Sequence, residues 1–300
     1  MAEILQHLIN GISLGSIYAL IALGYTMVFG VLKLINFAHG DIYMLGAFIG
    51  MFTAKIFSLD QNPSITSLCI TLVSSMIICA FLGFIIEKIA YRPLRKAPRI
   101  NLLITAVGVS LFLEFTSQVL FGADPKFFPQ VYVPAKQWII GDLHINPLQV
   151  IILAVSLFLM LVLNYVVFKT KVGKGMRAVQ FSHELASLMG IHTDKMISYT
   201  FMLGSSLAGA GGVLVGLAYP KVEPLMGVLP GLKAFSAAVL GGIGNIHGAF
   251  IGSLLIGLSE EFLVAYGAPS YRDALAFFML ILVLLFKPTG LFGKKTSEKV

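Results

Sequence analysis

The chain has 300 residues, of which 57% are hydrophobic and only 12% are charged. Soluble domains carry about 25% charged residues, so these side chains are too few to cover a water-exposed surface, and a soluble globular protein is excluded. The net charge of +7 comes from short clusters of Lys and Arg between apolar runs, which is typical of membrane loops rather than of a nucleic-acid surface. We expect membrane lipids around the chain and no nucleic-acid partner.

Apolar stretches long enough to cross a hydrocarbon core of about 30 Å, which takes about 20 helical residues, recur along the whole chain. They cover residues 5–31, 42–58, 65–86, 101–121, 148–168, 196–218, 228–244, 246–265 and 272–288. Segment 228–244 is short and ends in a glycine cluster, so it either crosses or is broken or re-entrant. The sequence therefore predicts an all-α integral membrane protein, a polytopic bundle of eight or nine transmembrane helices. Residues 1–300 are expected to form a single domain.

Two basic loops and the tail predict the orientation, because basic loops stay on the cytoplasmic side. We expect loops 87–101 and 169–195 and the C-terminus to be cytoplasmic, and segments 122–147 and 219–227 to be external. With nine crossings, the N-terminus is then external. Residues 1–32 contain no Lys or Arg, so the first apolar run is predicted to be an uncleaved span rather than a signal peptide.

The pentapeptide Gly-Ala-Phe-Ile-Gly occurs twice, at 46–50 and at 248–252, and we expect each copy to open a helix after a break rich in glycine and asparagine. Interrupted helices at corresponding places of an internal repeat mark the pathway in many transporters. The predicted pathway residues are Asn36, His39, Gly40, Asp41, Gly241, Gly242, Gly244 and Asn245. Two alternatives stay open. One is that the pentapeptide recurs by chance, without an internal repeat. The other is that Asp41 serves only as the N-cap of the helix that follows it.

Glycines four residues apart indicate close packing between membrane helices, because the missing side chain lets two backbones approach. The pairs are Gly11 and Gly15, Gly46 and Gly50, Gly212 and Gly216, and Gly248 and Gly252. For these pairs we favour packing over a direct functional role.

The motifs of an enzyme are missing from the sequence. There is no His-Glu-x-x-His pair, and the Gly-Lys dipeptides at 173–174 and 293–294 lack the following Ser or Thr of a phosphate-binding loop. No catalytic residue, metal or cofactor is therefore predicted, and a nucleotide that drives the protein must bind another chain. Three carboxylates in apolar runs, Glu114, Glu260 and Glu261, either line a pathway or lie near the membrane interface.

Residues 182–191 of the second basic loop predict a short amphipathic helix. Leu185, Leu188 and Met189 share one face, and Gly190 suits the left-handed position that ends a helix. Such a helix either lies on its own membrane domain or on lipid headgroups, or inserts into a groove of a soluble partner.

This loop resembles the coupling segment of ABC-importer membrane subunits, a Glu-Ala-Ala, three residues, Gly pattern that docks on the ATPase. It stands here as Glu184-Leu185-Ala186 and Gly190, with Leu185 in place of the middle Ala. From about residue 8 to Gly290, the chain is similar to the branched-chain amino-acid permease family, and to its shorter H-type subunit in particular. The motifs that carry this similarity are Asn10-Gly11, Gly15 to Leu20, Ile35 to Asp41, Lys233-Ala234-Phe235, Ala237 to Gly244 and Pro288-Thr289-Gly290.

The resemblance implies a bacterial inner-membrane importer of leucine, isoleucine and valine, and not an enzyme. Its expected partners are a homologous second permease, two cytoplasmic ATP-binding subunits, and a periplasmic or lipid-anchored substrate-binding protein. ATP would shift a coupling loop at about 169–195 and rotate the spans that carry the two breaks. The residues expected to couple to the ATPase are Arg177, Glu184, Ala186, Gly190 and Ile191. The alternatives are a permease for urea, an amide or another amino acid, and an ion-coupled carrier or channel that acts alone.

Overall fold

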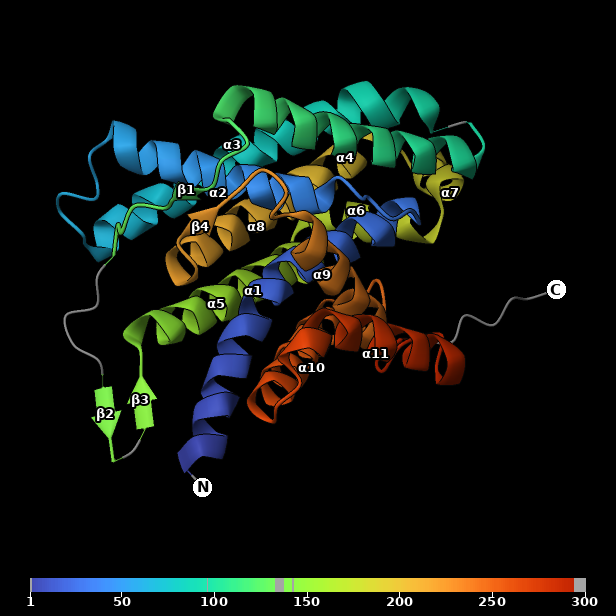
Figure 1. Ribbon diagram of the computed structural model, residues 1–300. Helices are drawn as coiled ribbons and strands as arrows, with labels where there is room; N and C mark the ends of the chain where they lie inside the picture. Colours follow the sequence, from blue (N-terminus) through green and yellow to red (C-terminus); the bar gives the residue numbers. More distant parts are fainter. Residues whose placement is uncertain (1, 96, 133–137, 142, 294–300) are drawn as a thin grey trace.

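The computed structural model describes residues 2–95, 97–132, 138–141 and 143–293, and it has the predicted all-α architecture (Figure 1). Each expected apolar run forms a helix whose ends lie within about three residues of the predicted ones. These helices are α1 (Ala2–Leu32), α2 (His39–Ile56), α3 (Ile65–Ile86), α4 (Arg99–Phe121), α5 (Pro147–Lys169), α8 (Thr193–Ala218), α9 (Val228–Gly241), α10 (Ile246–Ala265) and α11 (Arg272–Phe286).

Within the described ranges, seven helices are long and apolar enough to cross a membrane. They are α1, α3 with the turns that follow it, α4, α5, α8, α10, and α11 with the short turn η3 (Pro269–Tyr271) before it. The two remaining apolar helices are α2, which has 18 residues, and α9, which has 14. Segment 228–244 was expected either to cross the membrane or to be broken or re-entrant. Its helix α9 rises by about 1.5 Å per residue and is therefore too short to cross the membrane alone.

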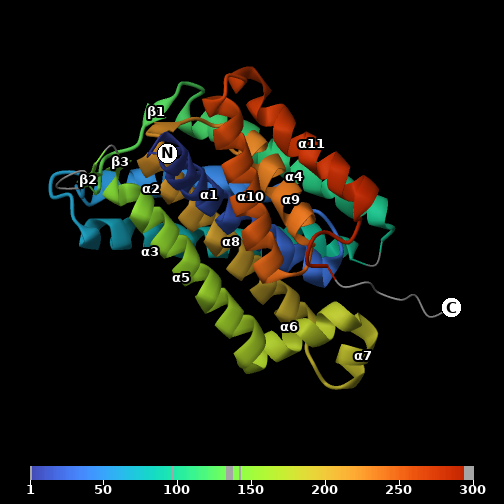
Figure 2. The same ribbon diagram turned by 90° about the horizontal axis from the view of Figure 1, so that it is seen from below.

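Helix α1 lies in the middle of the bundle and packs against α5, α8, α9 and α10 (Figures 1 and 2). It is apolar around most of its circumference, which is typical of a helix buried on all sides. Helix α8 fills the second central position, between α1, α2 and α3. By contrast, α11 exposes most of its apolar side chains, as a helix facing lipid or another subunit does.

Each glycine of the four pairs except Gly216, which faces the ring of Phe128, lies in a contact between helices, so the predicted packing role is confirmed for these seven. A Cβ atom on Gly46 of α2 would lie 2.6 Å from the Cα of Gly209 in α8, and one on Gly252 of α10 would lie 2.3 Å from the Ala237 carbonyl oxygen of α9. Only a residue without a side chain permits such close approach.

The two copies of the pentapeptide lie at different places in their helices. Residues 248–252 occupy the first turns of α10, as expected. Residues 46–50 begin two turns into α2, because that helix already starts at His39. The prediction that each copy opens its helix is therefore wrong for the first copy.

The two basic loops lie at one end of the bundle, here called the α7 end. The first loop forms a π-helical turn, η1 (Glu87–Tyr91), and a 3-10 turn, η2 (Arg92–Leu94), while the second forms α6 (Lys171–Phe181) and α7 (His183–Leu188). Figure 2 shows α6 and α7 extending beyond the other helices. Lys96 and the tail beyond residue 293 lie outside the described residues.

Short strands mark the opposite end. Strand β1 (Lys126–Phe127) pairs antiparallel with β4 (Lys221–Val222), and β2 (Trp138–Ile140) pairs with β3 (Leu143–Ile145). The start of α1 lies here too, because the Gln6 side chain donates to the carbonyl oxygen of His144 at 3.0 Å. The described strands of segment 122–147 and the start of segment 219–227 thus lie at the opposite end of the bundle from the two basic loops (Figure 1).

Candidate functional site

The first break lies between α1 and α2, over residues 33–38, about three residues earlier than expected. Its Asn36 is buried, as are His39 and Asp41 in the first turn of α2. The N-cap of α2 is Ala38, so the alternative that Asp41 caps this helix is wrong. Instead, the Asp41 carboxylate accepts a hydrogen bond of 2.5 Å from the hydroxyl of Ser110 on α4.

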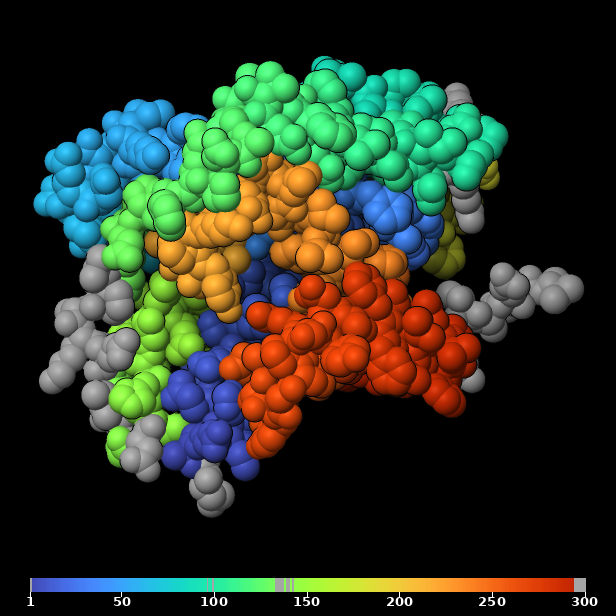
Figure 3. All heavy atoms as spheres, in the orientation of Figure 1, coloured from blue at the N-terminus to red at the C-terminus, as the bar shows by residue number. Residues whose placement is uncertain are grey.

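A cavity of about 200 Å³ lies beside Asp41, between α1, α2, α4 and the start of α9. Its polar lining includes Asp41, Ser110, Glu114 and Tyr25, and part of its apolar wall is Val107 and Leu111. Figure 3 shows α4, in teal to green, lying along the orange segment that leads into α9. Glu114 was expected either on a pathway or at an interface, and the structure places it in this cavity.

The starts of α2 and α9 touch each other at the cavity. A Cβ atom on Gly40 would lie 2.5 Å from the Gly227 carbonyl oxygen, and one on Gly231 would lie 3.1 Å from the Cα of Gly40. These glycines therefore allow two helix N-termini to meet backbone to backbone. Because a helix N-terminus carries partial positive charge, the cavity combines two such ends with two carboxylates.

The other predicted residues of the first break do not line this cavity. The His39 ring packs edge-on against Tyr25, with 4.8 Å between ring centroids. The Asn36 side chain points to η1, where its Oδ1 accepts a hydrogen bond of 2.6 Å from the Tyr91 hydroxyl.

The second break, residues 242–245, lies at the α7 end and is closed by the segment that follows α11. The backbone N–H groups of Leu291 and Phe292 donate to the carbonyl oxygens of Leu240 and Gly241. Asn245 caps α10 by accepting from the Gly248 N–H at 3.2 Å, and its amide donates to the Phe292 carbonyl at 3.0 Å.

Glycines make the close packing of this second break possible. A Cβ atom on Gly241 would lie 1.9 Å from the Gly248 carbonyl oxygen, and Gly242 adopts a φ of 105°. Gly244, by contrast, is exposed. The backbone expected to be free for a substrate is therefore largely hydrogen-bonded within the chain.

An ionic cluster joins α9, α10 and α11. The Lys233 ammonium lies 3.0 Å from the buried Glu260 carboxylate and 2.6 Å from Asp273, and Arg272 lies 3.1 Å from Glu260. Tyr18 of α1 donates to the same carboxylate at 3.1 Å. Sequence reasoning flagged Glu260 but missed Lys233, although a lysine within the apolar run 228–244 was itself a signal.

Glu261 lies apart from this cluster, near the start of α1. Its carboxylate accepts from Asn10 at 3.1 Å and lies 3.2 Å from the His7 ring. It faces a second, mostly polar cavity at the end of the bundle that carries the strands.

The short helix predicted within residues 182–191 is α7, which Ser182 caps, and a further helix, α6, precedes it. Leu185, Leu188 and Met189 are 54%, 83% and 81% exposed, so none of the residues that the structure describes covers this apolar face. Glu184 is also exposed, whereas Ala186 is buried and holds α7 to the bundle.

The remaining residues predicted for coupling shape the segment around α7. Gly190 has a φ of 77°, as expected for the residue that ends the helix, and the Ile191 N–H donates to the Ala186 carbonyl. The Arg177 guanidinium lies over the Phe168 ring of α5, 5.2 Å from its centroid. It therefore packs on the membrane helices of its own chain.

Across the described ranges, no group of three or more His, Cys, Asp or Glu side chains is placed to hold a metal ion. The sequence profile of a family described as branched-chain amino acid transport system, permease component, matches residues 7–284. The chain belongs to this family. As a permease with seven apolar spans among its described residues, it is a multi-pass membrane protein and part of an ABC transporter, and it is not an enzyme.

The permease is similar over its whole length to named transport proteins. It is 40% identical to the high-affinity branched-chain amino acid transport system permease protein LivH of Salmonella typhimurium, over 99% of this chain and 97% of the relative. It is 39% identical to the corresponding protein BraD of Pseudomonas aeruginosa, over 99% and 98%. A ribose import permease protein, RbsC of Escherichia coli, is 25% identical over 93% and 84%. No solved structure matches the permease.

Proposed function

We propose that this permease carries leucine, isoleucine and valine inward across a bacterial inner membrane, powered by separate ATPase subunits. The observation that carries this proposal is the uncovered apolar face of α7, which projects from one end of a chain related over its full length to branched-chain amino-acid permeases. The proposed assembly contains a homologous second permease, two ATP-binding subunits at the α7 end, and an external substrate-binding protein. The α7 end and the C-terminus are then cytoplasmic.

The ATPase contact is proposed to be α7, with Glu184 and the exposed apolar side chains at the centre. Ala186, Gly190 and Ile191 shape and orient this helix, and Arg177 fixes α6, which precedes it, on α5. An amphipathic helix that docks into a groove is a recurrent recognition mode, and it leaves the helix exposed when the partner is absent.

Reversing the charge of Glu184 tests the contact. We expect Glu184→Arg to lower the ATPase activity that copurifies with the tagged permease about 10-fold or more, because like charges brought together at an interface cost several kcal/mol. Asp60→Arg is the matched control, since Asp60 is exposed in the loop between α2 and α3 and undergoes the same charge change. A permease that purifies alone and transports without nucleotide in liposomes would favour a carrier or channel.

The substrate is proposed to pass through the cavity at Gly40 and Asp41. Its ammonium group would lie near Asp41 and Glu114, its carboxylate near the N-termini of α2 and α9, and its branched side chain against Val107 and Leu111. A volume of about 200 Å³ is below the roughly 300–1,000 Å³ of sites for drug-sized ligands and suits a single amino acid.

The predicted pathway residues outside the cavity have a different proposed role. We assign Asn36, His39 and the second break, with Gly241, Gly242, Gly244 and Asn245, to the ends of the helices that move during transport.

Neutralising Asp41 tests the cavity. In the reconstituted complex, we expect Asp41→Asn to raise the KM for leucine uptake about 10- to 100-fold, since a hydrogen bond to a charged group contributes about 1.5–3 kcal/mol. Asp124→Asn, on an exposed loop, should leave the KM unchanged. An unchanged KM in Asp41→Asn would place the pathway elsewhere. If the substrate is instead an uncharged amide or urea, the reconstituted complex should take up that compound and not leucine.

A further inference from the structure

The inner end of α3 is irregular. Residues 65–86 are α-helical, but Glu87–Tyr91 widen into a π-helical turn, and Arg92–Leu94 tighten into a 3-10 turn. A π-helical turn replaces the hydrogen bonds between residues four apart with bonds between residues five apart, and such turns occur frequently at functional sites. This turn lies at the α7 end, where α8 begins.

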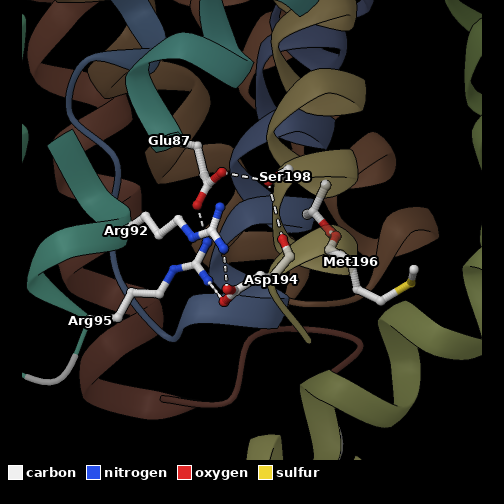
Figure 4. A network of polar contacts seen from close by, with 7 residues as sticks. Glu87, Arg92, Arg95, Asp194, Met196 and Ser198 are labelled. Atoms are coloured by element: carbon white, nitrogen blue, oxygen red, sulfur yellow. Dashed lines mark hydrogen bonds and ion pairs between the residues drawn. The ribbon is translucent and has the colours of Figure 1, made fainter. Parts of the chain in front are cut away.

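Two arginines of this region hold the start of α8 (Figure 4). Arg92 donates to one carboxylate oxygen of Asp194 at 2.5 Å, and Arg95 donates to the other at 2.6 Å. Arg95 also pairs with Glu87, which is fully buried and accepts a hydrogen bond of 2.5 Å from Ser198. Two arginines and two carboxylates balance in charge, so the cluster avoids an uncompensated buried ion.

The cluster lies next to the proposed coupling helix in the chain. Asp194 belongs to the first turn of α8, and α7 ends at Leu188. The short link between them contains Gly190 in its left-handed conformation. Only five residues separate the end of α7 from Asp194, so a displacement of α7 reaches Asp194 through a short stretch of chain.

The same π-helical turn also contacts the break at the start of α2. The buried Tyr91 hydroxyl donates to Asn36 at 2.6 Å, and the Tyr91 ring packs against Phe201 of α8, with 5.3 Å between centroids. Asn36 lies five residues before Asp41, which lines the cavity. One short segment thus bonds to α8 on one side and, through Asn36, to the break that precedes α2 on the other.

We propose that residues 87–95 are the positioning element that passes the movement of α7 and α8 to the start of α2. The movement enters this element at Asp194, because Arg92 and Arg95 both bind its carboxylate and are displaced with it. It leaves the element at Tyr91, whose hydroxyl is hydrogen-bonded to Asn36. This inference rests on the proposed function, because it assumes that α7 is moved by an ATPase. It predicts that breaking either contact leaves ATP hydrolysis intact and lowers the amount of substrate carried for each ATP consumed.

The test uses the full complex in liposomes and measures leucine uptake and ATP hydrolysis together. In Tyr91→Phe, which loses one hydroxyl and keeps the ring, uptake per ATP should fall about five-fold, within the range of measured coupling effects. Tyr199→Phe is the matched control, because Tyr199 is 42% exposed on α8. The melting temperature of each variant shows whether folding is preserved.

A second pair of variants decides the case even if Tyr91→Phe folds poorly. The Asp194 side chain is 49% exposed, so its substitution is tolerated structurally. Asp194→Ala should lower uptake per ATP, and Asp194→Glu, which keeps the carboxylate, should restore it. An unchanged ratio in Asp194→Ala, or a fall in uptake that only follows a fall in ATP hydrolysis, would overturn the proposal. A wild-type permease without copurifying ATPase would instead contradict the proposed function itself.

Discussion

Gly257→Leu is expected to leave little folded permease. A Cβ atom at position 257 of α10 would lie 2.4 Å from the backbone nitrogen of Gly15 in α1 and 2.7 Å from the Gly11 carbonyl oxygen. Those atoms are backbone, so no side-chain rotation relieves the overlap, and α1 must separate from α10. Overpacking costs about 1–3 kcal/mol and occasionally more, and we expect about 3 kcal/mol or more here because the central helix is displaced.

The measurement is the yield of monodisperse protein by size-exclusion chromatography in detergent, together with the melting temperature. Gly108→Leu is the matched control, because a Cβ atom on Gly108 of α4 would meet no described atom within 4 Å, and this variant is expected to behave like the wild type. Equal yields for the two leucine variants would mean that α1 and α10 do not pack through their glycines.

Lys233→Met is expected to destabilise the permease by about 2–3 kcal/mol. Removing one partner of a buried ion pair costs about 3–5 kcal/mol because the other charge is left uncompensated. Here Glu260 keeps Arg272 at 3.1 Å and the Tyr18 hydroxyl at 3.1 Å, so we place the loss below that range. Thermal unfolding in detergent measures the change.

Two further variants make the Lys233 prediction specific. Lys233→Met combined with Glu260→Gln removes both charges and should recover at least half of the lost stability. Lys221→Met breaks only an exposed pair, with Glu223, and should cost less than about 1 kcal/mol. If Lys233→Met melts at the wild-type temperature, the buried pair does not stabilise the arrangement of α9 on α10.

The helices could be predicted from the sequence because the property that defines them is local. An apolar run of sufficient length must be helical in a membrane, so even α3 and α10 were predicted with their observed ends. The packing of Gly46 and Gly252 was predictable for the same reason, since spacing along one helix reveals the face that meets another.

The candidate site was predicted only in part, because it depends on contacts between distant segments. Gly40 and Asp41 could be found from the break beside them, but Ser110 and Glu114 come from α4, and nothing in the sequence pairs that helix with α2. The closure of the second break by residues 291–292 was likewise invisible, since it consists of backbone hydrogen bonds between segments about 50 residues apart. Lys233, Arg272 and Asp273 were overlooked as an ionic cluster despite a local signal, because each is a charged residue within a predicted apolar run.

That closure also sets an order of events during synthesis. The carbonyl oxygens of Leu240 and Gly241 gain their partners only when Leu291 and Phe292 have left the ribosome. Until then, the junction of α9 and α10 lacks these two backbone hydrogen bonds. The last-made segment therefore completes a site begun about 50 residues earlier, so the junction of α9 and α10 reaches its final structure only at the end of synthesis.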